Sequence, residues 1–417
     1  MATNTFSPSP VSDAAEPPAS WASRLVWPVF LGAFGFLLTS YPARNIDIWG
    51  HLVAGRDAAS GVGLGASFTL LFDGLMAAGY AVGGGGLLVF GKAAAMGLLG
   101  VLLYETARSY SFRVLPAVVV GLALMAVSLR ANLQPQAVTY LLLGATTFWL
   151  TRHRGLPAWP SCWPLLVLFF AWANLDRGFV YGLATVALVW LGRFVDETRA
   201  APTSPATPRP SLLRLGGVLA VLCGVCLLNP ASRSGEFPLP VELQWLTTRS
   251  AGELLRSPMS AAYVRSVNDN PAALAYYPLL ALSVVGFALN RNAFRWERFL
   301  PSLVLGLLSV AADRAVPVFA VVAGPMAALN LAESLARSSG FAPGTARSPW
   351  RRRLATPFPF LVAGLFLVAA WPGWLQRPPY EPRRWAFDLP TAPAAAAEYL
   401  RGVGTHWVVL ILITAWL

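Results

Sequence analysis

The sequence has little charge and little cysteine. Only 12% of its 417 residues are charged, three are cysteine and three are histidine, whereas 56% are hydrophobic. The mean hydropathy of +0.56 indicates a membrane protein and not a soluble globule. All three cysteines lie in apolar runs. Cys223 and Cys226 form a C-x-x-C pair, but no second pair or nearby histidine accompanies them, so we interpret them as helix-packing residues and not as a zinc or redox site.

Several common functional motifs are also absent. The chain has no phosphate-binding G-x-x-x-x-G-K-[ST] loop, no zinc-binding H-E-x-x-H and no nucleophile elbow G-x-S-x-G. Its net charge of +12 comes almost wholly from arginines in loops and tails. No basic stripe is interleaved with aromatic residues, as single-strand binding requires. We therefore expect the arginines to orient the protein in a membrane and to contact membrane lipid, with no nucleic acid as partner.

Apolar runs recur along the chain. Many are about 15–20 residues long, close to the ~20 residues that a helix needs to cross the ~30 Å hydrocarbon layer. Because backbone polar groups cannot stay unpaired in lipid, such runs must be helical. The sequence therefore predicts an all-α, polytopic transmembrane protein with about eleven spanning helices. The predicted spans are Leu25–Tyr41, Gly86–Ala107, Val114–Leu129, Ala137–Leu150, Cys162–Asn174, Phe179–Trp190, Leu212–Leu228, Ala273–Leu289, Phe299–Ala312, Val316–Leu331 and Phe358–Leu375.

The segment Phe68–Val82 decides the predicted topology. It is short, contains Asp73 and ends in the glycine run Gly83–Gly86, which breaks a helix. If it lies along the membrane interface and the N-terminus is cytoplasmic, the arginine-rich loops all fall on the cytoplasmic side, as the positive-inside rule requires. These loops are Arg108/Arg113, Arg152/Arg154, Arg193–Arg209, Arg291–Arg298 and Arg337–Arg353. We predict a multi-pass protein of the inner (cytoplasmic) membrane.

The remaining ionisable residues then gather at helix ends on the outer side. Asp47 and His51 are four residues apart and share one face if Asp47 starts a helix. Two interpretations stay open. Asp47 is either a helix cap, with Trp49 as an interface anchor, or a general base or metal ligand, with His51 contacting an anionic substrate. No cofactor can be identified, and a divalent cation at Asp47 is the candidate.

Three further charged turns are predicted on the same side. They carry Arg130, the pair Asp176–Arg177 and the pair Asp313–Arg314. Arginine guanidinium groups suit a phosphate, so an outer pocket with these residues would fit a lipid pyrophosphate or a phosphosugar. The alternative is a purely structural role, in which the same residues pair with one another and hold helices together.

Short motifs give the chain a resemblance to bacterial multispanning proteins related to the GT-C glycosyltransferases, which use polyprenyl-phosphate sugars. The motifs are Asp47-Ile-Trp-Gly-His51-Leu-Val-Ala-Gly55-Arg56, Arg130 with Gln134, Trp172 through Phe179, Leu228-Asn229-Pro230, and Arg314 through Pro325. The resemblance implies membrane-parallel helices in the first outside loop, with Phe68–Val82 as the second of them. It implies that Asp47 activates the acceptor and that outer arginines hold the lipid phosphate. Gly50 and Asp176 depart from the group's pattern, which has Trp and His there.

Composition, topology and this resemblance together predict a disordered cytoplasmic tail (1–23), a GT-C-like transmembrane domain (24–375) and an extracytoplasmic tail or truncated domain (376–417). The leading function is transfer of a sugar from a polyprenyl-phosphate-linked sugar to an extracytoplasmic acceptor. The alternatives are a non-catalytic assembly or lipid-binding protein, and a transporter or flippase of an amphiphile. Candidate catalytic residues are Asp47, His51 and Asp176, and candidate substrate-binding residues are Trp49, Arg56, Arg130, Arg177 and Arg314.

Overall fold

The protein is described by a computed structural model in which the described residues are almost entirely helical and include no strand. These residues are 21–42, 47–59, 68–108, 112–153, 162–199, 212–234, 240, 243, 256–338 and 357–375. The all-α prediction is confirmed for this part of the chain. The first helix begins at Trp21, and the predicted C-terminal segment 376–417 lies outside the described residues.

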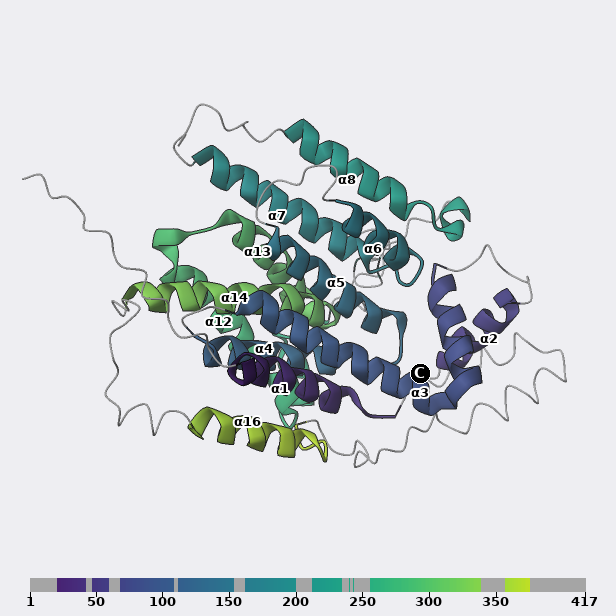
Figure 1. The fold of residues 1–417 in the computed structure, drawn as a ribbon, viewed down its shortest axis with the longest axis horizontal. Coiled ribbons are helices and arrows are strands. Elements are labelled where there is room, and N and C mark those ends of the chain that lie inside the picture. The colour runs from purple at the N-terminus through teal and green to yellow at the C-terminus, as the bar shows by residue number, and fades with distance from the viewer. Residues whose placement is uncertain are drawn as a thin grey trace, which may run out of the picture.

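Each predicted span coincides with a helix (Figure 1). The helices are α1 (Trp21–Thr39), α2 (Ile48–Ala59), α3 (Leu70–Ala107), α4 (Val114–Ser128), α5 (Pro135–Arg152), α6 (Trp163–Ala173), α7 (Phe179–Arg199), α8 (Leu212–Cys226), α10 (Ala261–Val267), α11 (Pro271–Leu274), α12 (Tyr276–Leu289), α13 (Trp296–Ala311), α14 (Val316–Ser338) and α16 (Pro357–Ala370). Short 3-10 turns are η2 (Pro230–Ser234), η4 (Arg291–Ala293) and η5 (Asp313–Ala315).

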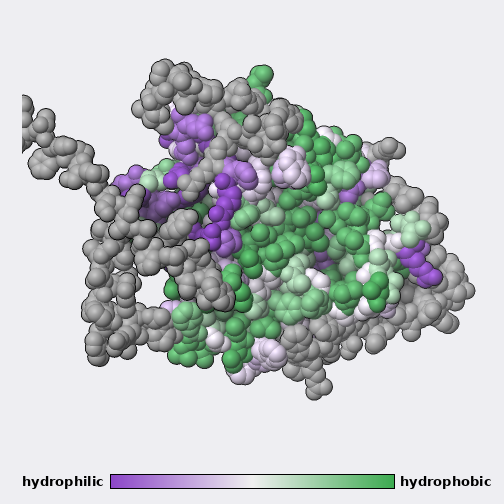
Figure 2. All heavy atoms as spheres, viewed as in Figure 1, coloured by the Kyte–Doolittle hydropathy of each residue, from purple (hydrophilic) through white to green (hydrophobic). Residues whose placement is uncertain are grey.

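Among the described residues, four helical segments are long and apolar enough to cross a membrane: Leu70–Ala107, Phe179–Arg199, Pro271–Leu289 and Asp313–Ser338. Five shorter helices are also apolar. Large hydrophobic side chains such as Val118, Val167, Val284 and Leu307 are exposed on the outside of the bundle. Figure 2 shows a broad hydrophobic surface across the middle of the visible face, with hydrophilic residues toward its sides. This is the surface of a membrane protein, whereas the number of eleven spans stays a prediction.

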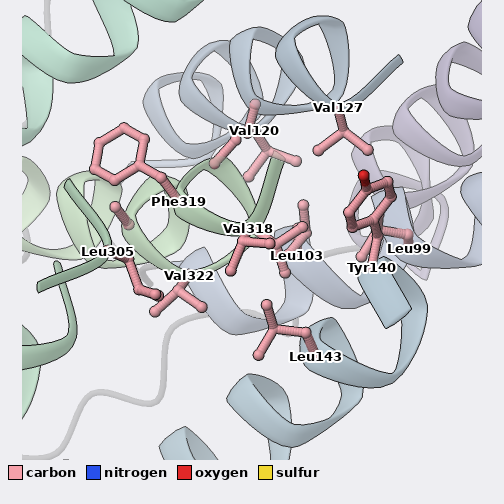
Figure 3. Packing of buried hydrophobic residues seen from close by; sticks show 14 of the residues in the cluster. Leu99, Leu103, Val120, Val127, Tyr140, Leu143, Leu305, Val318, Phe319 and Val322 are labelled. Carbon is pink, nitrogen blue, oxygen red and sulfur yellow. The ribbon is translucent and has the colours of Figure 1, made fainter. Parts of the chain in front are cut away.

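Helix α14 forms the centre of the bundle. From Val316 to Leu329 its sequence is apolar on every side, which is the pattern of a helix buried all round. Figure 3 shows Val318 and Val322 of α14 beside Val120 of α4 and Leu103 of α3. Helices α1 and α3 pack with their backbones in close contact. A Cβ on Gly100 of α3 would lie only 2.5 Å from the carbonyl oxygen of Leu31 in α1. Small residues at such crossings let helix backbones pack without a hydrophobic driving force in lipid.

Helix α3 is two helices joined at Gly84. This residue has φ 62° and ψ −161°, a conformation that is essentially restricted to glycine. The predicted break in the glycine run is therefore confirmed. Figure 1 shows the first part of α3 beside α2 at one end of the bundle, across the direction in which the other helices run.

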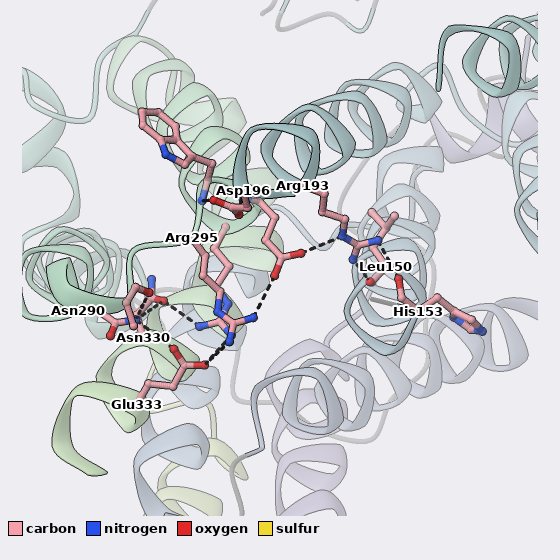
Figure 4. A network of polar contacts seen from close by, with 12 residues as sticks. Leu150, His153, Arg193, Asp196, Asn290, Arg295, Asn330 and Glu333 are labelled. Carbon is pink, nitrogen blue, oxygen red and sulfur yellow. Dashed lines mark hydrogen bonds and ion pairs between the residues drawn. The ribbon is translucent and has the colours of Figure 1, made fainter. Parts of the chain in front are cut away.

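The described ends of several arginine-bearing helices meet at the other end of the bundle, which we call the arginine-rich end. Arg193 is buried and donates to the Glu297 carboxylate at 2.8 Å and to the carbonyl oxygens of Leu150 and His153. Arg298 pairs with Glu333 at 2.7 Å, and Figure 4 shows Glu333, Arg295 and Arg193 in one network of polar contacts. These contacts bring the described ends together, and the cytoplasmic placement of the loops stays a prediction.

Candidate functional site

The first motif touches the turn between α4 and α5. Asp47 stands at the start of α2, where its carbonyl oxygen accepts a hydrogen bond from the His51 backbone at 3.1 Å. Its carboxylate is exposed and accepts a hydrogen bond from the Gln134 side chain at 2.6 Å. Gln134 precedes Pro135, the first residue of α5, so the carboxylate is fixed to a rigid helix start. Segments 87 residues apart are thus joined at one point.

Arg130, in the same turn, pairs with Asp313 at 2.7 Å. The arginine side chain is 40% exposed and the aspartate only 5%, so the guanidinium keeps a face that can meet a ligand. Asp313 is held in turn, because its backbone N–H donates to the Arg256 carbonyl oxygen at 2.8 Å. Burial, with a further contribution from the Asp313 carboxylate, raises the pKa of nearby Tyr263 to about 12, so that phenol stays neutral.

His51 is directed at a buried carboxylate in the first part of α3. Its Nδ1 lies 2.6 Å from Oδ1 of Asp73, and the Thr69 hydroxyl donates to the other carboxylate oxygen at 3.0 Å. The Phe72 ring meets the imidazole edge to face at 5.2 Å. From the sequence, Asp73 could be identified only as a charged residue in an otherwise apolar segment. Its pairing with His51 was missed, since the partner comes from another helix.

Asp176 is buried in the turn between α6 and α7. Its carboxylate accepts hydrogen bonds from the Thr139 hydroxyl at 2.5 Å and from the Gly178 backbone at 3.1 Å. Thr139 in turn accepts from the Trp172 indole at 2.8 Å. Burial raises the pKa of Asp176, opposed by these hydrogen bonds and by the Arg177 charge. The arrangement locks the turn and leaves the carboxyl little access to a substrate.

Asn229 ties this turn to the start of α3. Its side-chain amide donates to the carbonyl oxygens of Ala173 at 2.7 Å and Phe68 at 3.3 Å. The Leu71 backbone also donates to the Asn174 carbonyl oxygen at 3.0 Å. The motif around Asn229 therefore has a structural explanation, which the sequence alone did not provide.

These contacts link α2, the start of α3 and three turns into one region, which we call the Asp47 end. The turns are 129–134, 174–178 and 312–315. The predicted clustering of Asp47 and Arg130 at one end of the bundle is thus reproduced by the geometry. Arg177 joins the region, with its guanidinium 4.6 Å from the Phe68 ring centre.

Three predicted substrate-binding residues are less closely integrated. Trp49 meets Tyr80 edge to face at 6.2 Å, and its buried indole N–H finds no hydrogen-bond partner in the described part of the chain. Arg314 is exposed beside Asp313. Arg56 is also exposed, but it is eight residues beyond Ile48, so it lies about 12 Å further along α2. Arg56 is therefore well separated from the Asp47 carboxylate.

Metal binding is not supported by the donor set. Within the described ranges, no group of three or more His, Cys, Asp or Glu side chains could hold a metal ion. Asp47 is engaged by an amide and His51 by Asp73. The role of Asp47 as a ligand for a divalent cation stays a prediction.

The fold and the site define the class: an α-helical membrane protein with apolar helices that can span a bilayer and a polar centre built on loop ends. No protein-family model matches the chain, and no match was found among curated proteins. The likeness to GT-C enzymes accordingly rests on the short motifs alone.

Proposed function

We propose that the protein is an inner-membrane glycosyltransferase of GT-C type, which moves a sugar from a polyprenyl-phosphate carrier to an extracytoplasmic acceptor. The observation that carries the proposal is the joining of Asp47 to the Arg130–Gln134 turn at 2.6 Å. An exposed carboxylate and a partly exposed guanidinium then stand at the same end of the bundle, as base and phosphate site require.

The orientation follows from charge. The arginine-rich end faces the cytoplasm, because an excess of arginine in short loops marks the cytoplasmic side. The Asp47 end then faces outward. In this orientation α2 and the first part of α3 lie in the outer interface, with exposed Leu71 and Leu75 toward the lipid. The kink at Gly84 supports this placement, since it turns the first part of α3 away from the bundle direction.

The chemistry is a displacement at the anomeric carbon of the carrier-linked sugar. The acceptor hydroxyl oxygen forms the new bond to that carbon as the bond to the phosphate oxygen breaks. Asp47 takes the hydroxyl proton, and Gln134 fixes the carboxylate that receives it. Arg130, Arg177 and Arg314 stabilise the negative charge that develops on the departing lipid phosphate. In this mechanism Asp176 has a structural role: it stabilises the turn that carries Arg177. The mechanism does not use the catalytic role predicted for Asp176.

The test is sugar transfer by the full chain in proteoliposomes that contain a radiolabelled polyprenyl-phosphate sugar. We expect Asp47→Asn to lower kcat by about 10²–10⁴-fold, the usual contribution of a general base. Asp57→Asn is the matched control, because Asp57 is an exposed acid on the same helix. Arg130→Gln should weaken carrier binding. Full activity of correctly folded Asp47→Asn protein would refute the assigned role.

One observation favours the non-catalytic alternative. Asp313 pairs with Arg130 and so offsets much of the charge that a phosphate would need. A lipid-binding or assembly protein would bind the carrier in the same assay but form no glycosylated product. The flippase alternative needs charged residues within the spans, and the buried Lys92 is held structurally by the Tyr41 carbonyl oxygen at 3.1 Å.

A further inference from the structure

Only one ring nitrogen of His51 faces the carboxylate of Asp73. The ring nitrogen Nδ1 lies 2.6 Å from a carboxylate oxygen, whereas the other nitrogen, Nε2, takes no part in this contact. The Asp73 side chain is only 2% exposed and the His51 side chain 20%. The Asp73 carboxylate is therefore shielded from solvent. The His51 imidazole is the group of this pair that solvent or substrate can reach.

The neighbours of the pair fix its geometry. Thr69 donates to the second carboxylate oxygen at 3.0 Å, which leaves the first oxygen to accept from Nδ1. The Phe72 ring packs against the imidazole at 5.2 Å. Close packing of α2 on α3 is enforced at Gly55, where a Cβ would lie 2.5 Å from the carbonyl carbon of Asp73. The imidazole thus has little freedom to turn.

We propose that Asp73 is a positioning residue that holds the proton of the His51 imidazole on Nδ1, so that Nε2 accepts a hydrogen bond from a hydroxyl of the acceptor. The hydrogen bond made by one ring nitrogen sets the tautomer, and hence the role of the other nitrogen. The inference rests on the proposed function and deepens it. It makes the ligand of His51 a hydroxyl-bearing acceptor and not the anionic lipid phosphate.

Asp47 and Nε2 then serve one acceptor together. Residues four apart on a helix are neighbours on the same face, with Cβ atoms about 5–6 Å apart. One hydroxyl gives its proton to Asp47, and a second hydroxyl of the same molecule donates to Nε2. The acceptor class that satisfies both groups is a polyhydroxylated molecule, such as a sugar unit of a glycan.

The tautomer can be observed directly, because the chain has only three histidines. His153→Gln with His406→Gln leaves His51 as the single imidazole. We expect the nitrogen-15 spectrum of this full-length protein in lipid nanodiscs, near neutral pH, to show Nδ1 protonated and Nε2 unprotonated. Asp73→Leu should move the proton to Nε2, the form that a free imidazole prefers. Thr69→Val is the matched control and should keep the proton on Nδ1, since the carboxylate remains.

Three spectral outcomes would overturn the inference: an imidazole protonated on both nitrogens, a proton on Nε2 in the parent protein, or no change in Asp73→Leu. Circular dichroism and size-exclusion chromatography verify that each variant is folded. In the transfer assay, Asp73→Leu should raise KM for the acceptor by roughly tenfold, the effect of one lost hydrogen bond, and leave KM for the carrier unchanged. Equal changes in both constants would indicate a merely structural role and refute the proposal.

The two proposals fail separately. Parent protein that shows the expected tautomer but transfers no sugar would refute the glycosyltransferase function and the acceptor assignment, while the Asp73–His51 pairing would stand. Active protein whose tautomer does not depend on Asp73 would refute the positioning role alone.

Discussion

Replacement of Gly55 by alanine should release α2 from α3. A Cβ at this position would lie 2.5 Å from the carbonyl carbon of Asp73, closer still to its oxygen, and 2.9 Å from Cβ of Ala77. Backbone atoms cannot move aside as a flexible side chain can, so the overlap costs about 1–3 kcal/mol. Gly50, on the same helix, has no atom within 4 Å of such a Cβ. Both alanines gain about 1 kcal/mol of helix propensity, so the difference between the two variants isolates the overlap.

The assay is hydrogen exchange of peptides that cover α2. A local opening free energy lowered by about 1–3 kcal/mol raises the open population by roughly 5- to 150-fold. We expect exchange of α2 in Gly55→Ala to exceed that in Gly50→Ala by this factor, because the gain in helix propensity is common to both variants. Because His51 and Asp73 come from these two helices, the exposure of α2 should also separate them. Equal exchange in the two variants would show that the close approach at Gly55 does not hold α2 in place, and the reasoning would be refuted.

Three further expectations follow from the structure. Gly84→Ala should destabilise the protein by about 1–3 kcal/mol in thermal unfolding, because its backbone conformation suits only glycine, whereas Gly91→Ala, at an open helical position, should not. Burial raises the pKa of Asp176, so the folded protein binds the carboxyl proton more tightly than the unfolded chain does. The stability that this proton contributes is lost as the pH rises through the pKa of Asp176 in the folded state. Asp176→Asn should abolish that part of the pH dependence of the unfolding temperature. Arg298→Met should cost about 1–3 kcal/mol, since the arginine side chain is only 6% exposed and its removal takes a donor from Glu333 and from the buried Asn330. Arg152→Gln, where the arginine side chain is 42% exposed, should cost at most about 1 kcal/mol.

The helices could be predicted because their signal is local. A run of apolar residues must be helical in lipid wherever it packs. Each predicted span therefore overlaps a helix, closely at α4 (Val114–Ser128), whereas α7 continues to Arg199, beyond the predicted end at Trp190. The break at Gly84 was equally local, since consecutive glycines favour a backbone turn. The grouping of Asp47 with Arg130 needed only the alternation of helix directions along the chain.

The pairings could not be predicted in the same way. Whether His51 meets Asp73, or Arg130 meets Asp313, depends on the rotation and depth of each helix, and these are set by packing against distant segments. Asp176 shows the consequence most clearly. Its position in a charged turn suggested a catalytic acid, yet Thr139 of another helix encloses it.

The amino-acid sequence by itself determined that the described chain is a bundle of apolar helices and that Asp47 and Arg130 share one end of it, because hydrophobicity and helix length act residue by residue. Only the tertiary structure decided which charges are bound to a partner and which stay accessible. That choice depends on distances of a few ångströms between segments as far apart as 183 residues in the chain, and on side chains that no local pattern orients.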